Sequence, residues 1–106
     1  MIADAPLYSP LSADPDLAGL VDLFLAELPA RRQVLQNSFA NGDCELLART
    51  AHQLKGAGGS YGFPAVTWAA AQLEQAVRSG QSPARTGQYL DELLAVFDRC
   101  SAGVKQ

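Results

Sequence analysis

The sequence predicts an all-α fold: an antiparallel up-and-down four-helix bundle with an additional N-terminal helix separated by a kink at Pro29. Apolar residues recur at spacings of three and four along most of the chain, which places them on one face of a helix. No segment shows the sustained alternation of apolar and polar residues that is typical of a strand. The connections between the periodic segments are short, and short connections favour antiparallel neighbours.

The first helix is expected to begin at Asp14 and Pro15. An aspartate can cap the free amides of a helix start, and proline fits the first helical turn. Residues 1–12 contain Pro6 and Pro10 among small residues and are expected to form a flexible lead-in. The apolar stripe of this helix consists of Leu17, Leu20, Val21, Phe24, Leu25 and Leu28.

Pro29 is expected to kink or end this first helix. Proline lacks the amide hydrogen, and its ring clashes with the preceding turn of a helix. From Ala30 the apolar pattern resumes as a second helix, which should close at Asn41-Gly42. The sequence therefore predicts five helical segments, of which the last four form the bundle.

Polar caps and prolines mark the three remaining helices. Asp43 can cap the third helix, which is expected to end near Tyr61. Pro64 begins the fourth helix, which runs to about Ser79, and Ser82-Pro83 opens the fifth. The residues expected to face inward on these last two helices are Val66, Ala69, Ala70, Leu73, Val77, Leu90, Leu93, Leu94, Phe97 and Cys100.

The single tryptophan, Trp68, lies on the predicted fourth helix. One aromatic residue at helical spacing usually belongs to a core, because burial of its large apolar surface is favourable. We therefore expect Trp68 to be packed or partly covered rather than to serve as a platform for a ligand.

Length and composition indicate one domain. The chain has 106 residues, of which 48% are apolar, enough for a single modest core. We expect the helical bundle to span residues 13–102, followed by a frayed tail at 103–106. The net charge of −3 argues against a nucleic-acid surface, which would show clustered Lys and Arg.

The sequence also predicts a cytoplasmic protein without membrane insertion and without a metal site. Residues 1–15 contain no basic region followed by an apolar run, and no apolar stretch approaches the roughly 20 residues of a membrane-spanning helix. Cys44 and Cys100 are expected to be thiols rather than a disulfide. A single histidine and scattered acidic residues form no metal-binding motif.

The stretch from Ala51 to Gly62 is the most informative part of the chain, because it contains the only histidine and four of the nine glycines. On a helix, His52 points away from the apolar face. Lys55 and Gly56 follow it by three and four residues, so they are its neighbours on the surface. Arg49 and Gly59 belong to the same outward face.

Each of these residue types has a chemical meaning. A neutral imidazole has a reference pKa of about 6.5 and a nucleophilic nitrogen that can carry an electrophile such as phosphorus. Lys55 would offset phosphoryl charge as a point cation, with Arg49 as a weaker candidate. Gly56 and Gly59 remove side chains that would hold another macromolecule away from His52. The pattern indicates a nucleophilic site open to a protein partner.

These residues give the chain a family resemblance. The stretch A-H-Q-L-K-G-A-G-G-S-Y-G, from Ala51 to Gly62, resembles the signature of histidine phosphotransfer (HPt) domains. These are four-helix modules that relay phosphoryl groups between receiver domains in two-component signalling. A looser similarity includes Leu73-Glu74 and the turn Asn41-Gly42-Asp43, and covers most of the chain from about Asp16 onward.

The resemblance implies a role for each residue of the motif. His52 would be phosphorylated, with Lys55 as its electrostatic neighbour. Gly56 and Gly59 would admit the aspartyl phosphate of a receiver domain, and Gln53 and Arg49 would belong to the same partner-binding surface. Three other residues are expected to contribute to docking: Leu20, Phe24 and Ala48.

Glu74 occupies the place where family members often set a polar side chain against the unreactive ring nitrogen. A carboxylate there would fix the tautomer of His52 and raise the basicity of the other nitrogen. Gln75 or Gln72 could take this place if the helix phase differs. The alternative interpretation is that Glu74 is a solvated surface acid.

The resemblance further implies the partners. They would be response-regulator receiver domains, which would supply Mg²⁺, and a hybrid sensor kinase, of which this chain could itself be a part. The chain would bind no cofactor of its own, would be a phosphoryl carrier without ATP-dependent kinase activity, and is expected to be a monomer.

Two other functions remain open. The bundle could be an interaction module that docks receivers or other signalling proteins without accepting phosphate. His52 could also be the general base of a small hydrolase. The second alternative is weak, because no Ser or Cys nucleophile with an orienting acid stands beside the histidine in a recognised motif.

Overall fold

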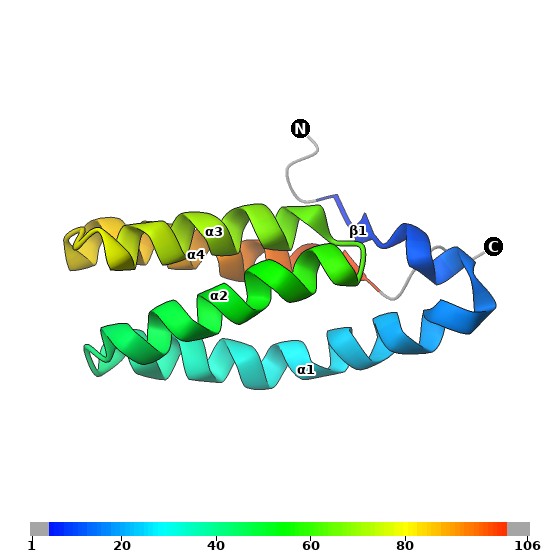
Figure 1. Cartoon of the computed structure of the whole chain (residues 1–106), viewed down its shortest axis with the longest axis horizontal. Coiled ribbons are helices and arrows are strands. Elements are labelled where there is room, and N and C mark those ends of the chain that lie inside the picture. The colour runs from blue at the N-terminus through cyan, green and yellow to red at the C-terminus, as the bar shows by residue number, and fades with distance from the viewer. Residues whose placement is uncertain (1–4, 102–106) are drawn as a thin grey trace.

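The apolar stripes of the sequence form four helices in the computed structural model, which describes residues 5–101. Successive helices are joined at alternating ends, so the bundle runs up and down (Figure 1). The prediction of an all-α, antiparallel four-helix bundle is confirmed. The helices are α1 (Pro15–Ala40), α2 (Cys44–Ser60), α3 (Pro64–Arg78) and α4 (Pro83–Arg99). The remaining elements are β1 (Leu7–Tyr8), the 3-10 helix η1 (Pro10–Ala13) and β2 (Cys100–Ser101).

The predicted helix starts are confirmed at three sites, because each depends only on local hydrogen bonding. The side chain of Asp14 accepts a hydrogen bond from the amide of Asp16, and that of Asp43 accepts one from Leu46. Ser82 does the same for the amide of Arg85. Each bond satisfies an amide that has no partner inside the helix.

Helix α1 continues through Pro29, so the prediction of an additional helix separated at this residue was wrong (Figure 1). Proline in a helix interior removes one hydrogen bond, here to the carbonyl of Leu25, and costs about 3 kcal/mol. The helix buries Phe24 and Leu28 before Pro29 and Leu35 after it in the same core. This burial on both sides offsets the local cost.

The N-terminal segment is tied to the bundle, which corrects the expected flexible lead-in for residues 5–12. Strand β1 pairs in parallel with β2, and the Nε of Arg99 donates to the carbonyl of Ala5. The hydroxyl of Ser9, a residue only 3% exposed, donates to the carbonyl of Tyr61 at 2.6 Å. Residues 1–4 and the predicted tail at 103–106 lie outside the described residues.

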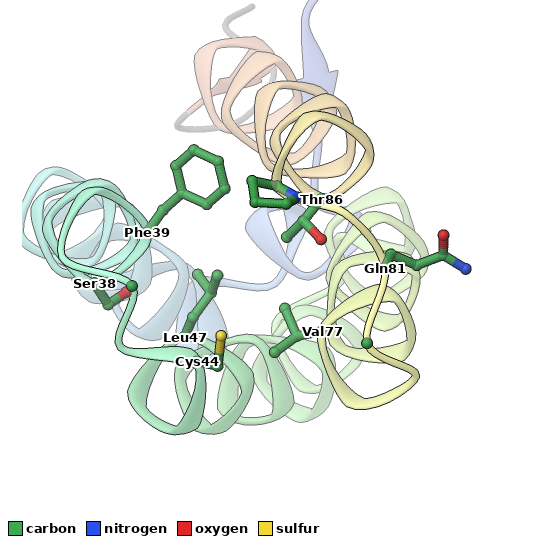
Figure 2. A pocket seen from close by; sticks show the side chains of 10 residues that line it. Ser38, Phe39, Cys44, Leu47, Val77, Gln81 and Thr86 are labelled. Carbon is green, nitrogen blue, oxygen red and sulfur yellow. The ribbon is translucent and has the colours of Figure 1, made fainter.

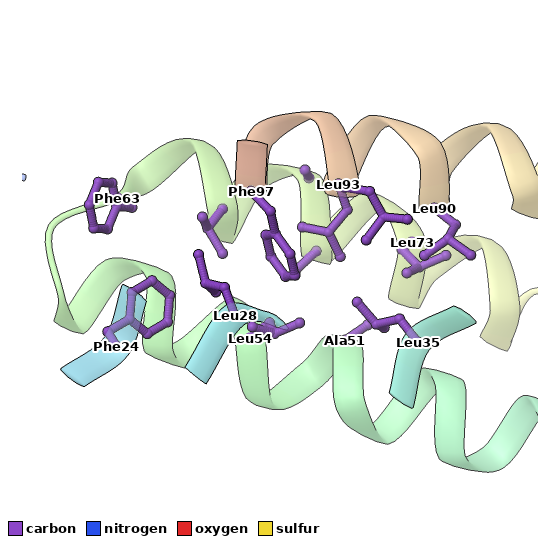
Figure 3. Packing of buried hydrophobic residues seen from close by; sticks show 14 of the residues in the cluster. Phe24, Leu28, Leu35, Ala51, Leu54, Phe63, Leu73, Leu90, Leu93 and Phe97 are labelled. Atoms are coloured by element: carbon purple, nitrogen blue, oxygen red, sulfur yellow. The ribbon is translucent and has the colours of Figure 1, made fainter. Parts of the chain in front are cut away.

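One hydrophobic core runs along the bundle axis (Figure 3). Near one end the ring of Phe24 stacks on those of Tyr61 and Phe63, with centroids 5.0 and 5.8 Å apart. The core residues labelled in Figure 3 are Phe24, Leu28, Leu35, Ala51, Leu54, Phe63, Leu73, Leu90, Leu93 and Phe97. Within residues 5–101, no helix is both long and apolar enough to cross a membrane.

Trp68 is 70% exposed, so the expectation that it is packed or partly covered was wrong. The buried face of α3 contains Ala69 and Ala70, next to Trp68 in sequence, and Trp68 itself points away from that face. Small alanine side chains let α3 pack closely on its neighbours, and an indole at those positions would not fit.

Candidate functional site

His52 lies on the outer face of α2, with 62% of its side chain exposed. The opposite face of α2 is buried and includes Ala51 and Leu54, so His52 points toward solvent. On the same outer face, Gly56 has nothing within 4 Å of the position that a Cβ would occupy. The imidazole therefore stands beside a bare stretch of helix backbone.

Glu74 on α3 is the side chain that contacts the ring. Its Oε2 lies 3.1 Å from the Nδ1 of His52, and only 10% of the Glu74 side chain is exposed. Glu74 is therefore not a solvated surface acid, which was the alternative interpretation. Gln75 is exposed and Gln72 is partly exposed. An ionised carboxylate accepts hydrogen bonds only, so this geometry favours the tautomer with the proton on Nδ1 and leaves Nε2 unprotonated.

Two cations share this carboxylate with the imidazole. The Nζ of Lys55 lies 2.9 Å from Oε1 of Glu74, and the Nε of Arg78 lies 2.8 Å from Oε2. Burial by itself raises the pKa of Glu74. The hydrogen bonds from Lys55 and Arg78, the charge of Lys55 and the contact with His52 outweigh burial and lower the pKa to about 2. Glu74 is thus an anion at neutral pH, with both oxygens occupied.

The position of Glu74 depends on a close approach of α2 and α3. A Cβ on Gly58 would lie 2.7 Å from the backbone nitrogen of Thr67, so only glycine fits there. The hydroxyl of Thr67 donates to the carbonyl of Lys55 at 2.7 Å, which ties the two helices together. Glu74 follows Thr67 by two helical turns on the same face of α3, and the antiparallel direction brings it to His52.

The other predicted partner-binding residues surround this centre. Gly59 is exposed, and its Cβ position would be 3.5 Å from the hydroxyl of Thr67, an ordinary contact. Arg49 and Gln53 are exposed and border a groove of about 260 Å³ between α1 and α2. The lining of that groove from α1 consists of Ala30, Arg31 and Val34.

Two of the three expected docking residues cannot line a surface. Phe24 is 2% exposed and its ring stacks on those of Tyr61 and Phe63, and Ala48 is 3% exposed on the inner face of α2. Leu20 is 47% exposed, as a docking residue requires. Leu23, which the sequence analysis did not single out, is 62% exposed on the same helix.

Arg78 and Thr67 are the site residues that sequence reasoning missed. A signal for Arg78 was present, because it follows Glu74 by four residues and such pairs meet on a helix surface. Thr67 gave no comparable signal, because its contact with Lys55 depends on how two different helices align.

A separate hollow of about 130 Å³ lies at the end of the bundle where α1 ends and α4 begins (Figure 2). Its walls include Phe39, Leu47 and Val77, and Figure 2 shows the sulfur of Cys44 directed into it. His52 is not part of its lining.

The cysteines and acids of residues 5–101 form no metal centre. Cys44 and Cys100 are free thiols, and burial raises the pKa of Cys100 to about 11 although the charge of Arg99 opposes the rise. No group of three or more His, Cys, Asp or Glu side chains that could hold a metal ion occurs in this range.

The fold and the site define a class of protein: a helical bundle with one oriented imidazole on its surface, flanked by cations and open backbone. The family model of the Hpt domain matches residues 19–103. The chain belongs to the Hpt domain family, whose members act in histidine phosphotransfer within phosphorelays. Hpt domains are phosphocarriers without kinase activity and interact with response-regulator receiver domains. No curated protein and no solved structure matched the chain.

Proposed function

We propose that this chain relays a phosphoryl group between the aspartates of receiver domains, with His52 as the carrier. The observation that supports this most directly is the contact between Nδ1 of His52 and Glu74, because it directs the other ring nitrogen, Nε2, outward as a free nucleophile. The side chain of His52 is accessible to a partner, and Gly56 beside it places no side chain in the way.

The transfer conserves atoms and charge without a separate base. The lone pair of Nε2 attacks phosphorus, the new N–P bond forms, and the P–O bond to the receiver's aspartate breaks with its electron pair left on the carboxylate. The ring keeps its proton on Nδ1 and becomes a cation. Glu74 stabilises that cation through the contact at 3.1 Å. The reverse transfer to a second receiver follows the same path.

Lys55 would offset the negative charge of the phosphoryl group. It lies one helical turn from His52, on the same face of α2, and 39% of its side chain is exposed. Rotation of its flexible stem would move the charge from Glu74 to a phosphoryl group on Nε2. Lys55 would then offset charge in both the free and the phosphorylated protein.

The receiver would contribute the acceptor aspartate and Mg²⁺. Magnesium requires oxygen ligands, and Glu74, the carboxylate that contacts His52, already has both oxygens paired with cations. The donor set at His52 therefore does not fit Mg²⁺. We further propose that the chain is a monomer in the cytoplasm. It would act downstream of a hybrid sensor kinase or as one of the domains of such a kinase.

The test is transfer of label from a radiolabelled phospho-receiver to the wild-type protein and to His52→Gln. We expect label that is acid-labile, alkali-stable and absent from the variant, because the chain has a single histidine. Circular dichroism and receiver binding by both proteins serve as controls. Absence of label with several receivers, despite folded protein and measurable binding, would contradict the relay and favour the interaction module.

A further inference from the structure

Arg78 and His52 share a single carboxylate oxygen. The Nε of Arg78 lies 2.8 Å from Oε2 of Glu74, and the Nδ1 of His52 lies 3.1 Å from the same atom. Lys55 occupies the other oxygen. Unlike Lys55, Arg78 comes from the same helix as Glu74, so this ion pair does not depend on how α2 and α3 are aligned.

A carboxylate at Nδ1 has two opposing effects on a nucleophilic histidine. It selects the tautomer with a free Nε2, which the reaction needs. It also attracts a second proton to the ring, because a carboxylate stabilises the imidazolium as an ion pair. The imidazolium is protonated on Nε2 and cannot attack phosphorus. A lone Glu74 would therefore orient the ring and at the same time favour its unreactive form.

The charges around the ring oppose that second effect. On α3, Glu74 carries one negative charge and Arg78 one positive charge, and on α2 Lys55 adds a second cation to the same carboxylate. Arg49 lies one turn before His52, and across the groove α1 contributes Arg31, which is paired with Glu27. The cluster is net positive before the ring gains a proton.

We propose that Arg78 is a positioning residue that acts through Glu74. Its positive charge partly offsets the negative charge of Glu74, which would otherwise favour a second proton on Nε2 of His52. The inference rests on the proposed carrier role of His52. It also assigns Arg78 a task during transfer: Arg78 remains on Glu74 when Lys55 turns toward the phosphoryl group. Glu74 then keeps a cationic partner in both states of the protein.

The first test measures the ring directly. The protein contains one histidine, so its ring ¹⁵N resonances report on His52 alone. The ring is titrated in the wild type, in Arg78→Gln and in Arg78→Lys, which keeps the charge. Arg85→Gln is the matched control, because Arg85 is exposed on α4 with its guanidinium 5.6 Å from the ring centre of Tyr89.

We expect Arg78→Gln to raise the ratio of protonated to neutral ring about two- to threefold at a given pH, since the side chain of Arg78 is 58% exposed and its charge is partly screened. Arg78→Lys and Arg85→Gln should titrate as the wild type does. An unchanged or lower ratio in Arg78→Gln, an equal shift in Arg85→Gln, or no restoration by lysine would overturn the proposal.

The second test follows reactivity with phosphoramidate, a small donor that needs no receiver. Attack by Nε2 forms an N–P bond and releases ammonia from phosphorus. Arg78→Gln should react about twofold more slowly than the wild type at mildly acidic pH, and the difference between the two rates should disappear as the pH is raised. A rate ratio that does not change with pH would overturn the proposal.

The two tests separate this inference from the relay. The titration requires neither phosphate nor a partner, so it can succeed even if the chain accepts nothing from a receiver. Conversely, transfer that is lost in His52→Gln while Arg78→Gln titrates like the wild type would support the relay and refute the role of Arg78.

Discussion

At the residue scale, Glu74 is the group around which the site is arranged. Its side chain is 10% exposed and its carboxylate has three partners: His52 and Arg78 contact Oε2, and Lys55 contacts Oε1. Burial of an isolated carboxylate is unfavourable, and three donors from two helices compensate for it. The arrangement that orients His52 is therefore also part of what holds α2 and α3 together.

This double role predicts a pH dependence of stability. The pKa of Glu74 falls from 4.5, its ordinary value, to about 2 in the folded protein. A depressed carboxylate pKa contributes stability that is fully present above about pH 4.5 and is lost as the pH falls toward 2. Because the partners of Glu74 are partly exposed, we expect this contribution to be on the order of 1 to 2 kcal/mol.

Urea unfolding of the wild type and of Glu74→Gln between pH 7 and pH 2 measures the effect. The difference in free energy of unfolding should be largest at pH 7 and should shrink below about pH 4.5, since a glutamine does not titrate. A difference that stays constant over this range would show that Glu74 contributes through packing and not through its charge.

At the element scale, the spacing of α2 and α3 depends on Gly58. A methyl group at this position would lie 2.7 Å from the backbone nitrogen of Thr67. Backbone cannot move aside as a side chain can, so we expect Gly58→Ala to destabilise the protein by about 1 to 3 kcal/mol and to displace Glu74 from His52. Urea unfolding and phosphotransfer rates should both show a loss.

Gly56→Ala is the matched control for this prediction. Nothing lies within 4 Å of its Cβ position, and alanine is a better helix former by about 1 kcal/mol, so the variant should be at least as stable as the wild type. Its receiver binding should weaken, because the methyl group protrudes beside His52. Equal stability of the two variants would contradict the assignment of Gly58 to the helix interface.

Pro29 provides a second prediction at this scale. In the continuous helix α1, an alanine could donate its amide to the carbonyl of Leu25, which Pro29 leaves without this bond. We expect Pro29→Ala to raise the free energy of unfolding by about 1 to 3 kcal/mol, measured by urea denaturation, with no change in phosphotransfer. Lower stability would show that the proline ring contributes more by packing than it costs the helix.

These helices show which features of the fold could be predicted from the sequence. The caps at Asp14, Asp43 and Ser82 could be predicted because each depends on neighbours a few residues away. The continuity of α1 through Pro29 could not be predicted from neighbouring residues, because burial on both sides of the proline decides whether the helix continues.

For the site, too, the features within one helix could be predicted and the contacts between helices could not. The outward direction of His52 and its neighbours Lys55 and Gly56 follow from helical periodicity within one segment. The contact with Glu74 was expected only through the family resemblance. The part played by Thr67 requires the alignment of two helices, which no local pattern contains.

At the scale of the whole molecule, the two ends of the described chain meet beside the turn that follows α2. Strand β1 pairs with β2, which follows α4, and Ser9 bonds to Tyr61 at the end of α2. The N-terminal segment thus closes one end of the bundle (Figure 1). His52 lies more than two helical turns before Tyr61, so this closure should affect folding more than chemistry.

Two serines of this segment allow a matched test. The hydroxyl of Ser9 donates to the carbonyl of Tyr61 at 2.6 Å, whereas the buried hydroxyl of Ser12 has no hydrogen-bond partner among the described residues. Ser9→Ala leaves a carbonyl unpaired and should lower the free energy of unfolding by about 1 to 2 kcal/mol. Ser12→Ala removes an unpaired buried hydroxyl and should be neutral or slightly stabilising.

Urea unfolding distinguishes the two variants, and phosphotransfer from a phospho-receiver, measured per folded molecule, should be the same in both. A loss of transfer in Ser9→Ala at full folding would mean that the N-terminal closure influences the face around His52. Equal stability of the two variants would mean that the bond from Ser9 to Tyr61 is replaced by water, and that the strand pairing and the bond from Arg99 to Ala5 hold the N-terminal segment on the bundle.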